Sequence, residues 1–202
     1  MAKIAVDVVL LPSEGMTEKA IAANKELLKR NAAEIVLDKE NCLPHISLAM
    51  GCIDEKDIAD IEEILKTLVK EIILGQLNAI GIHIGTNTAG EKVSLLEIEK
   101  TEAIQSLHEE VMRRLARYFS YDVKAEMVLS SSEISESTLD WIKNYPEKSS
   151  FEKFFPHITI GYEEINNLSF PIKFDATKLA LCHLGNHCTC RKILASANLT
   201  IR

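Results

Sequence analysis

Two short segments of this chain repeat one pattern of residues, and nothing else in the sequence repeats so closely. Residues 44–49 and 156–161 both read Pro-His-apolar-hydroxyl-apolar-small. In an extended strand successive side chains point to opposite faces, so residues two apart share a face. The residues that we expect on the shared face are His45, Ser47 and Ala49 in the first segment, and His157, Thr159 and Gly161 in the second. The apolar residues between them, together with Tyr162, are expected to face a core.

The two motifs lie in the two halves of a chain in which strand and helix patterns alternate. Runs of alternating or continuous apolar residues predict strands at residues 3–11, 43–50, 77–85, 93–98, 155–162, 178–184 and 188–199. Apolar residues at helical spacing predict helices at 17–30, from Asp54 onward, after a Thr101 cap, and at 136–144, where Pro146 is expected to end the helix. This order predicts a duplicated α+β unit.

Length and composition favour a single globular domain, or one domain with two lobes, over residues 1–202. Apolar residues make up 47% and charged residues 26%, which is ordinary for such a domain. The net charge of −7 argues against an extended duplex nucleic acid as partner. It does not exclude a small phosphate-bearing ligand, since a pocket can be locally positive.

The remaining sequence signals favour a cytoplasmic protein. Asp7 interrupts the apolar start where a signal peptide would have its centre, and no apolar run approaches the roughly 20 residues of a membrane helix. The five cysteines are odd in number, which favours reduced thiols. No glycine-rich loop opens a helix, so the sequence does not support a dinucleotide or nucleoside-triphosphate fold.

The paired motifs carry the side chains that the opening of a phosphodiester requires. One imidazole can take a proton from the attacking oxygen while a second gives one to the leaving oxygen. The hydroxyls of Ser47 and Thr159 can donate hydrogen bonds to the non-bridging oxygens, where charge accumulates. This arrangement needs no metal, and no carboxylate cluster suggests one.

The pair of His-x-Ser/Thr strands, in a chain near 200 residues, resembles the two-histidine (2H) phosphoesterase superfamily, which includes the 2′-5′ RNA ligase and cyclic phosphodiesterase families. The resemblance implies an α+β fold with two pseudo-symmetric lobes, each an antiparallel sheet flanked by helices, that face a central cleft. It implies that His45 and His157 are the catalytic pair and that Ser47 and Thr159 bind phosphate. It also implies metal-independent action on 2′,3′-cyclic phosphates or 2′-5′ linkages of nucleotides or RNA ends.

We therefore expect a monomer, without cofactor, metal or membrane contact, that acts on a nucleotide or RNA terminus carrying a cyclic phosphate. Two alternatives use the same cleft. One is the reverse reaction, a 2′-5′ ligation, and the other is a nucleotide-binding module without turnover. The chain departs from a minimal member in a longer stretch at 121–154, which we interpret as a lid or a substrate-selecting insert.

A group of soft ligands at residues 182–190 competes with this interpretation. It contains three cysteines and two histidines, which suit zinc. The spacing fits no common zinc motif, so we favour a structural hairpin that turns at Gly185-Asn186. His83 and His108 lie among apolar residues and are interpreted as structural, although His83 could reach the cleft.

Overall fold

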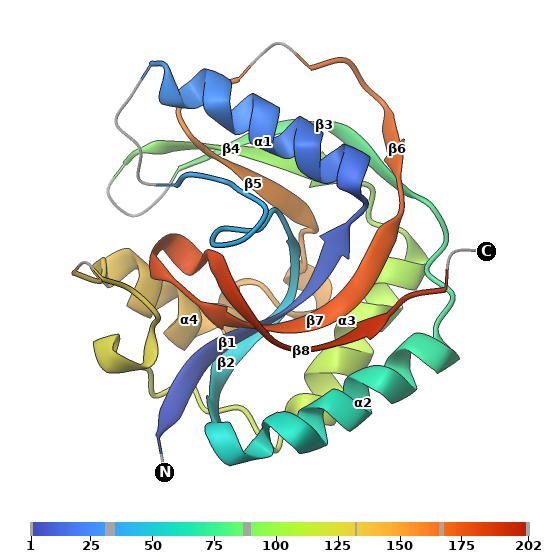
Figure 1. Cartoon of the computed structure of the whole chain (residues 1–202), viewed down its shortest axis with the longest axis vertical. Helices are drawn as coiled ribbons and strands as arrows, with labels where there is room; N and C mark the ends of the chain where they lie inside the picture. Colours follow the sequence, from blue (N-terminus) through green and yellow to red (C-terminus); the bar gives the residue numbers. More distant parts are fainter. Residues whose placement is uncertain (1, 31–34, 87–89, 132, 166–167, 201–202) are drawn as a thin grey trace.

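The structure is a computed structural model that describes residues 2–30, 35–86, 90–131, 133–165 and 168–200. Its centre is one curled antiparallel sheet of eight strands in the order β6-β3-β4-β5-β2-β1-β7-β8 (Figure 1). The strands are β1 Lys3–Pro12, β2 Ile46–Asp54, β3 Leu77–Thr86, β4 Lys92–Ile98, β5 His157–Tyr162, β6 Ile172–Phe174, β7 Ala176–Leu184 and β8 Cys190–Asn198.

Four helices pack on this sheet: α1 Glu14–Leu28, α2 Ile58–Glu71, α3 Glu102–Leu115 and α4 Glu136–Lys148. Helix α1 lies against β5, α2 against β8 and β7, and α3 and α4 both contact β2 (Figure 1). Four 3-10 turns complete the fold: η1 Glu55–Asp57, η2 Ala125–Met127, η3 Phe151–Lys153 and η4 Asn186–Cys188. Among the described residues, no helix has the length and apolarity that crossing a membrane would require.

The sheet divides into two halves of four strands that meet between β2 and β5. The described register joins these strands through one pair, Ile46 opposite Ile158. Each motif strand thus forms the inner edge of its own half. The expected α+β fold with two pseudo-symmetric halves is confirmed, whereas the assignment of residues 1–202 to one domain stays a prediction.

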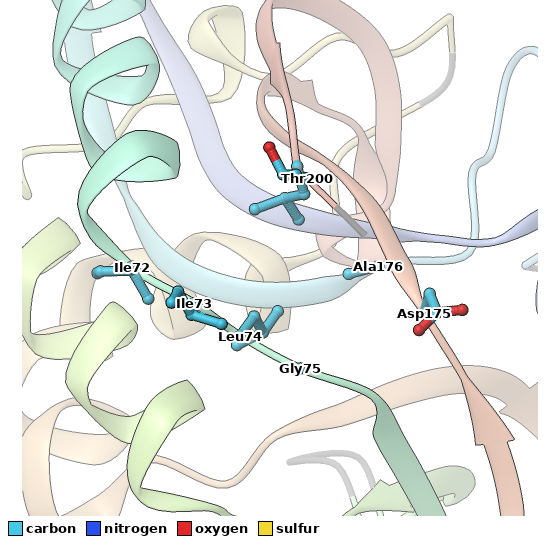
Figure 2. A pocket seen from close by; sticks show the side chains of 8 residues that line it. Ile72, Ile73, Leu74, Gly75, Asp175, Ala176 and Thr200 are labelled. Carbon is cyan, nitrogen blue, oxygen red and sulfur yellow. The ribbon is translucent and has the colours of Figure 1, made fainter. Parts of the chain in front are cut away.

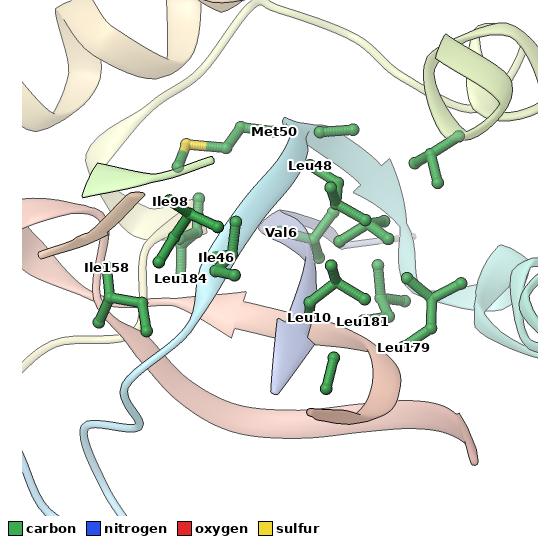
Figure 3. Packing of buried hydrophobic residues seen from close by; sticks show 14 of the residues in the cluster. Val6, Leu10, Ile46, Leu48, Met50, Ile98, Ile158, Leu179, Leu181 and Leu184 are labelled. Carbon is green, nitrogen blue, oxygen red and sulfur yellow. The ribbon is translucent and has the colours of Figure 1, made fainter. Parts of the chain in front are cut away.

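The main core lies on the side of the sheet where Ile46 and Ile158 are fully buried (Figure 3). Strand β1 supplies Val6, Val8 and Leu10 to it, which alternate with residues of the other face. Burial of large aliphatic side chains contributes about 1.5–3 kcal/mol each. Packing on this side of the sheet therefore holds both motif strands in place.

Several sequence predictions for the elements were wrong in detail. Helix α1 begins at Glu14, three residues before the expected start at Thr17, and Ser13 is the non-helical residue that precedes it. Pro146 does not end α4 but lies inside its last turn. Strand β6 was not expected at all, because three residues are too few for a recognisable pattern. The loop between β3 and β4 includes residues 87–89, which lie outside the described residues.

Candidate functional site

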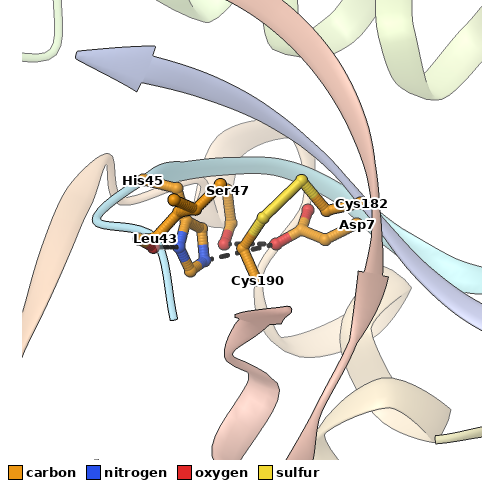
Figure 4. The surroundings of a disulfide bond; sticks show 6 residues. All are labelled: Asp7, Leu43, His45, Ser47, Cys182 and Cys190. Carbon is orange, nitrogen blue, oxygen red and sulfur yellow. Dashed lines mark hydrogen bonds and ion pairs between the residues drawn. A yellow bond between two sulfur atoms is a disulfide. The ribbon is translucent and has the colours of Figure 1, made fainter. Parts of the chain in front are cut away.

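The first motif places His45 at the start of β2 through a local turn. Its Nδ1 lies 2.7 Å from the carbonyl oxygen of Leu43, on the other side of Pro44 (Figure 4). A carbonyl oxygen can only accept, so Nδ1 must carry the hydrogen. In the neutral ring Nε2 is then the nitrogen with a free lone pair. The side chain of His45 is 12% exposed, so that nitrogen is close to solvent but largely desolvated.

The second motif repeats this local geometry. His157 Nδ1 lies 2.8 Å from the carbonyl oxygen of Phe155, again across a proline. The two imidazoles therefore have the same tautomer, with Nε2 available as a base. The exposed ring of Phe155 stacks on His157 at 5.5 Å between centroids and meets His83 edge-on at 5.2 Å. His83 is exposed, so the structure places it beside the second motif rather than in the core.

The sheet brings the two motifs together on one face. Ile46 and Ile158 lie opposite one another and point into the core, so their neighbours along each strand point to the other face. We call this the motif face; it carries His45, Ser47, His157 and Thr159. Continuing the antiparallel register sets His45 across from Thr159 and Ser47 across from His157. We therefore expect each imidazole to lie near the hydroxyl of the other motif.

A bulge follows the hydroxyl residue in both motifs, and it corrects the expected faces. In β2 the register with β1 passes from Ser47 to Ala49, which leaves Leu48 as the extra residue. In β5 the register with β4 passes from Thr159 to Gly161, which leaves Ile160 as the extra residue. A bulge reverses the alternation of faces. The following residues therefore lie on the opposite faces from those predicted.

The small residues of the motifs are accordingly absent from the motif face. Ala49 lies opposite Val8 on the core side, and a Cβ atom on Gly161 would come within 3.1 Å of Asn24 Nδ2 on α1. Tyr162, in contrast, lies opposite Val93 on the motif face, where its hydroxyl is 3.0 Å from His187 Nδ1. The prediction of Ala49 and Gly161 as spacers for a ligand was wrong, whereas Tyr162, predicted to face the core, is half-buried and packs against the core residues.

Two buried polar side chains, which the sequence analysis did not assign to the site, hold these bulges. Asn24 of α1 donates to the carbonyl oxygen of Ile160 at 2.7 Å, and His108 of α3 donates to that of Leu48 at 2.7 Å. Both side chains are fully buried. A buried carbonyl group needs such a partner, and a bulge leaves it without one in the sheet. The interpretation of His108 as a structural residue is confirmed, and its role is to bind the carbonyl group of the first bulge.

Each of these side chains also binds the segment that leads into the other motif. Asn24 accepts from the Leu37 N–H at 3.0 Å, ahead of the first motif. His108 Nε2 accepts from the Phe151 N–H at 2.7 Å, ahead of the second motif, and its ring stacks on Phe154 at 4.1 Å. Each helix thus connects the bulge of one motif with the segment that precedes the other motif. No spacing rule predicts these contacts, although a polar residue within the apolar face of a helix can indicate a buried hydrogen-bonding role.

Asp7 is a third side chain at the site that the sequence analysis missed. It lies in the middle of β1, and its Oδ2 accepts a hydrogen bond from Ser47 Oγ at 2.6 Å (Figure 4). The same Oδ2 is 3.8 Å from His45 Nε2. The carboxyl group is fully buried, and burial raises its pKa well above the usual range despite hydrogen bonds from Ser47 and the Ala49 backbone.

The surroundings of both imidazoles favour the neutral form. Burial lowers the pKa of His45 to about 4; the Leu43 carbonyl opposes this shift and His157 adds to it. Burial also lowers the pKa of His157, which the Phe155 carbonyl opposes and His83 favours. The effect of His157 on the pKa of His45 is consistent with their shared face. Two neutral bases are therefore poised at the motif face, and one of them must gain a proton before it can act as an acid.

The cysteine-rich hairpin differs from its prediction. Cys182 and Cys190 form a disulfide with 5.6 Å between their Cα atoms, so the expectation of reduced thiols was wrong for this pair. The predicted hairpin is present, but its turn is a 3-10 segment over Asn186–Cys188. The disulfide lies on the motif-face side of β1, near His45 and Asp7 (Figure 4). In the part of the chain that the structure describes, no three His, Cys, Asp or Glu side chains are grouped as a metal site.

Two cavities were found, and neither is lined by a residue of the two motifs. A cavity of about 50 Å³ lies between the segment after α2, lined by Ile72 and Leu74, and the segment around Ala176 and Thr200 (Figure 2). A wider hollow of about 470 Å³ lies between Tyr121 and the last turn of α4, near Lys143 and Pro146. The second one lies in the 121–154 stretch, whose α4 contacts β2. The role of this stretch as a lid or insert stays a prediction.

Comparison with known proteins identifies the fold. No protein-family model and no curated protein matches this sequence. The E. coli LigT structure in apo form matches with a TM-score of 0.53 and 14% identity over 99% of both chains. E. coli LigT complexed with NADP+ matches with a TM-score of 0.53 and 15% identity over 98% of this chain and 99% of LigT. The chain therefore has the fold of E. coli LigT.

Proposed function

We propose that this chain, folded like LigT, is a metal-independent phosphodiesterase that opens 2′,3′-cyclic phosphates or 2′-5′ linkages of nucleotides or RNA ends. The observation that carries the proposal is the meeting of two His-x-hydroxyl motifs on one face, with the same tautomer in both imidazoles. A nucleotide ligand has support from the LigT structure that contains NADP+. We retain the expectation of a monomer.

The chemistry uses His45 and His157 as an acid and base pair. The Nε2 atom of one ring takes a proton from water as its oxygen attacks phosphorus. The other ring, in its protonated form, gives a proton to the departing ribose oxygen. Each positioned acid or base contributes about 10²–10⁴-fold to the rate. The near-symmetry of the motifs leaves the two roles open.

Thr159 and Ser47 are proposed to bind the non-bridging oxygens of the phosphate. The register extended from the pair of Ile46 and Ile158 supports this proposal, because it would bring each hydroxyl near the imidazole of the other motif, where one phosphate can contact both groups. Ser47 is already bound to Asp7, and its hydrogen must turn to the ligand for this role. Hydrogen bonds to developing charge in a site of low dielectric are worth more than in water.

The experiment is incubation with 2′,3′-cyclic nucleotides in the presence of a chelator, followed by phosphorus NMR. We expect the cyclic phosphate resonance to convert to an open monoester. His45→Ala and His157→Ala should each lose at least about 10²-fold in rate. His183→Gln is the matched control, because His183 lies across from the core residue Val6 and bonds the Met127 carbonyl. Full activity in either alanine variant would remove that histidine from the mechanism.

Two other outcomes would change the proposal. Saturable nucleotide binding without turnover on any cyclic phosphate would indicate a nucleotide-binding module. Joining of a cyclic phosphate end to a 5′-hydroxyl end would indicate the ligase direction. The cytoplasmic location belongs to the same proposal, and the Cys182–Cys190 disulfide weighs against it, because such bonds are rare in reducing compartments.

A further inference from the structure

A carboxyl group in the middle of a buried strand is costly, and Asp7 requires an explanation. It lies between Val6 and Val8 in β1 and has no exposed surface. An isolated ionised carboxylate in such surroundings costs several kcal/mol unless it is neutralised or paired. The carboxyl group must therefore hold a proton itself or lie beside a group that holds one.

The described structure offers one partner that can take that proton. Among the described residues, His45 is the basic group within 4 Å of the Asp7 carboxyl, at 3.8 Å from Nε2 to Oδ2. If the proton is on Asp7, both groups are neutral. If it is on His45, the two form an ion pair. Both arrangements contain one proton for the two groups and no net charge.

We propose that Asp7 is the proton partner of His45, and that the two hold one proton between them in the folded protein. The proposal rests on the proposed function only for what the proton does in turnover. A phosphate that approaches His45 Nε2 favours the imidazolium, so in that state the shared proton is on His45 and Asp7 is ionised, with no net uptake of a proton from solvent. Asp7 thereby acts as a positioning residue, and the first motif differs from the second in having its own supply of acid.

The hydrogen bond from Ser47 follows the same proton. While Asp7 is ionised, Ser47 Oγ donates to its Oδ2. When Asp7 is protonated it donates to Ser47 Oγ instead, and the serine hydrogen is free to turn toward a ligand. Transfer of the proton to His45 therefore returns the serine hydrogen to Asp7, so Ser47 can donate to a phosphate oxygen only in the state that precedes this transfer.

The other titratable groups around the pair come from three elements. His157 of β5 faces His45, while Tyr145 of α4 and Cys188 of η4 face Asp7. Burial raises the pKa of the Tyr145 hydroxyl and of the Cys188 thiol, so both stay neutral over the acidic range. His157 is common to all variants below, and its contribution cancels in their differences.

The test is the pH dependence of stability, which needs neither ligand nor turnover. In the unfolded chain His45 holds a proton and Asp7 is ionised between about pH 4 and 6.5, which is again one proton for the pair. In this pH range folding therefore does not change the number of protons bound to the wild-type pair. In Asp7→Asn the unfolded His45 binds a proton that the folded one does not, so stability rises with pH.

The measurement is urea unfolding at steps between pH 4 and 6.5 for four proteins: wild type, Asp7→Asn, His45→Gln and the double variant. Relative to wild type, the folding equilibrium constant of Asp7→Asn should rise by about 100-fold from pH 4 to 6.5, from the shift of His45 to about 4. The folding equilibrium constant of His45→Gln, relative to wild type, should fall over the same range, since the raised pKa of Asp7 gives stability that is lost as pH rises. The stability of the double variant should change with pH in the same way as that of wild type. Asp60→Asn, an exposed carboxylate on α2, is the control and should show the same dependence on pH.

If the stabilities of Asp7→Asn and wild type changed with pH in parallel, the proposal of a shared proton would be overturned. This comparison is sufficient for the test if His45→Gln does not fold. In turnover, Asp7→Asn should lower kcat by about tenfold or more at pH 7, with KM within about twofold, because asparagine keeps the shape but holds no transferable proton. An unchanged kcat in an active enzyme would overturn the role of the proton. If the wild type turns over no cyclic phosphate, the proposed function fails while the unfolding curves still decide the inference.

Discussion

Replacement of Asn24 with alanine should destabilise the protein more than any surface substitution. Its side chain makes three buried hydrogen bonds: to the Ile160 carbonyl at 2.7 Å, to the Ile35 carbonyl at 2.9 Å and from the Leu37 N–H at 3.0 Å. Alanine removes both donors and the acceptor and leaves three backbone groups without a partner. Each unsatisfied buried group costs about 1–3 kcal/mol. Since some relaxation is expected, we predict a loss of about 3–5 kcal/mol in the free energy of unfolding.

The assay is urea unfolding at pH 7, followed by circular dichroism, for Asn24→Ala and for Asn144→Ala. Asn144 is the matched control, because its side-chain hydrogen bonds to described residues go to Asp140 in its own helix and it is partly exposed. We expect that variant to lose less than about 1 kcal/mol. The slope m should be the same for both, so that midpoints report stability. A loss in Asn24→Ala no larger than in Asn144→Ala would refute the assignment of Asn24 as the anchor of the second bulge.

Two further substitutions test the bulge and the disulfide. Gly161→Ala should lower the free energy of unfolding by about 1–3 kcal/mol, because residue 161 has φ +149° and its Cβ atom would meet Asn24. Gly15→Ala on α1, with open space around it, is the control and should be neutral or slightly stabilising, and equal effects at the two glycines would contradict this account. Cys182→Ser should lose about 2–3 kcal/mol under non-reducing conditions, as expected for a bond between cysteines eight residues apart, and a reductant should remove the difference from wild type. An unfolding midpoint of wild type that a reductant leaves unchanged would show that this disulfide contributes nothing.

Sequence patterns predicted those parts of the site that depend on neighbouring residues. The Pro-His turn sets the tautomer of each imidazole through a carbonyl only two residues away. The strand pattern set His45 with Ser47, and His157 with Thr159, because two-residue alternation is a local property. Helical spacing located α2 and α3, whose buried residues follow one stripe.

Alternation failed where the strands pair irregularly. The bulges at Leu48 and Ile160 depend on the register with β1 and β4, which no local pattern specifies. The faces of Ala49 and Gly161 were therefore wrong by one residue. The disulfide between Cys182 and Cys190 likewise depends on how β7 meets β8 beyond the turn.

By itself the sequence determined which side chains are the candidates for the chemistry and that they come in two equivalent sets, since residue type and short-range spacing are properties of the chain alone. Only the tertiary structure decided that Asp7 lies beside His45, and that Asn24 and His108 hold the bulges. These contacts join residues that are far apart in the sequence. Asp7 and Ser47 are 40 positions apart, Asn24 and Ile160 are 136 apart, and His108 and Leu48 are 60 apart. The physical reason is that burial, which makes an unpaired carbonyl or carboxyl group costly, arises only when distant segments close around it.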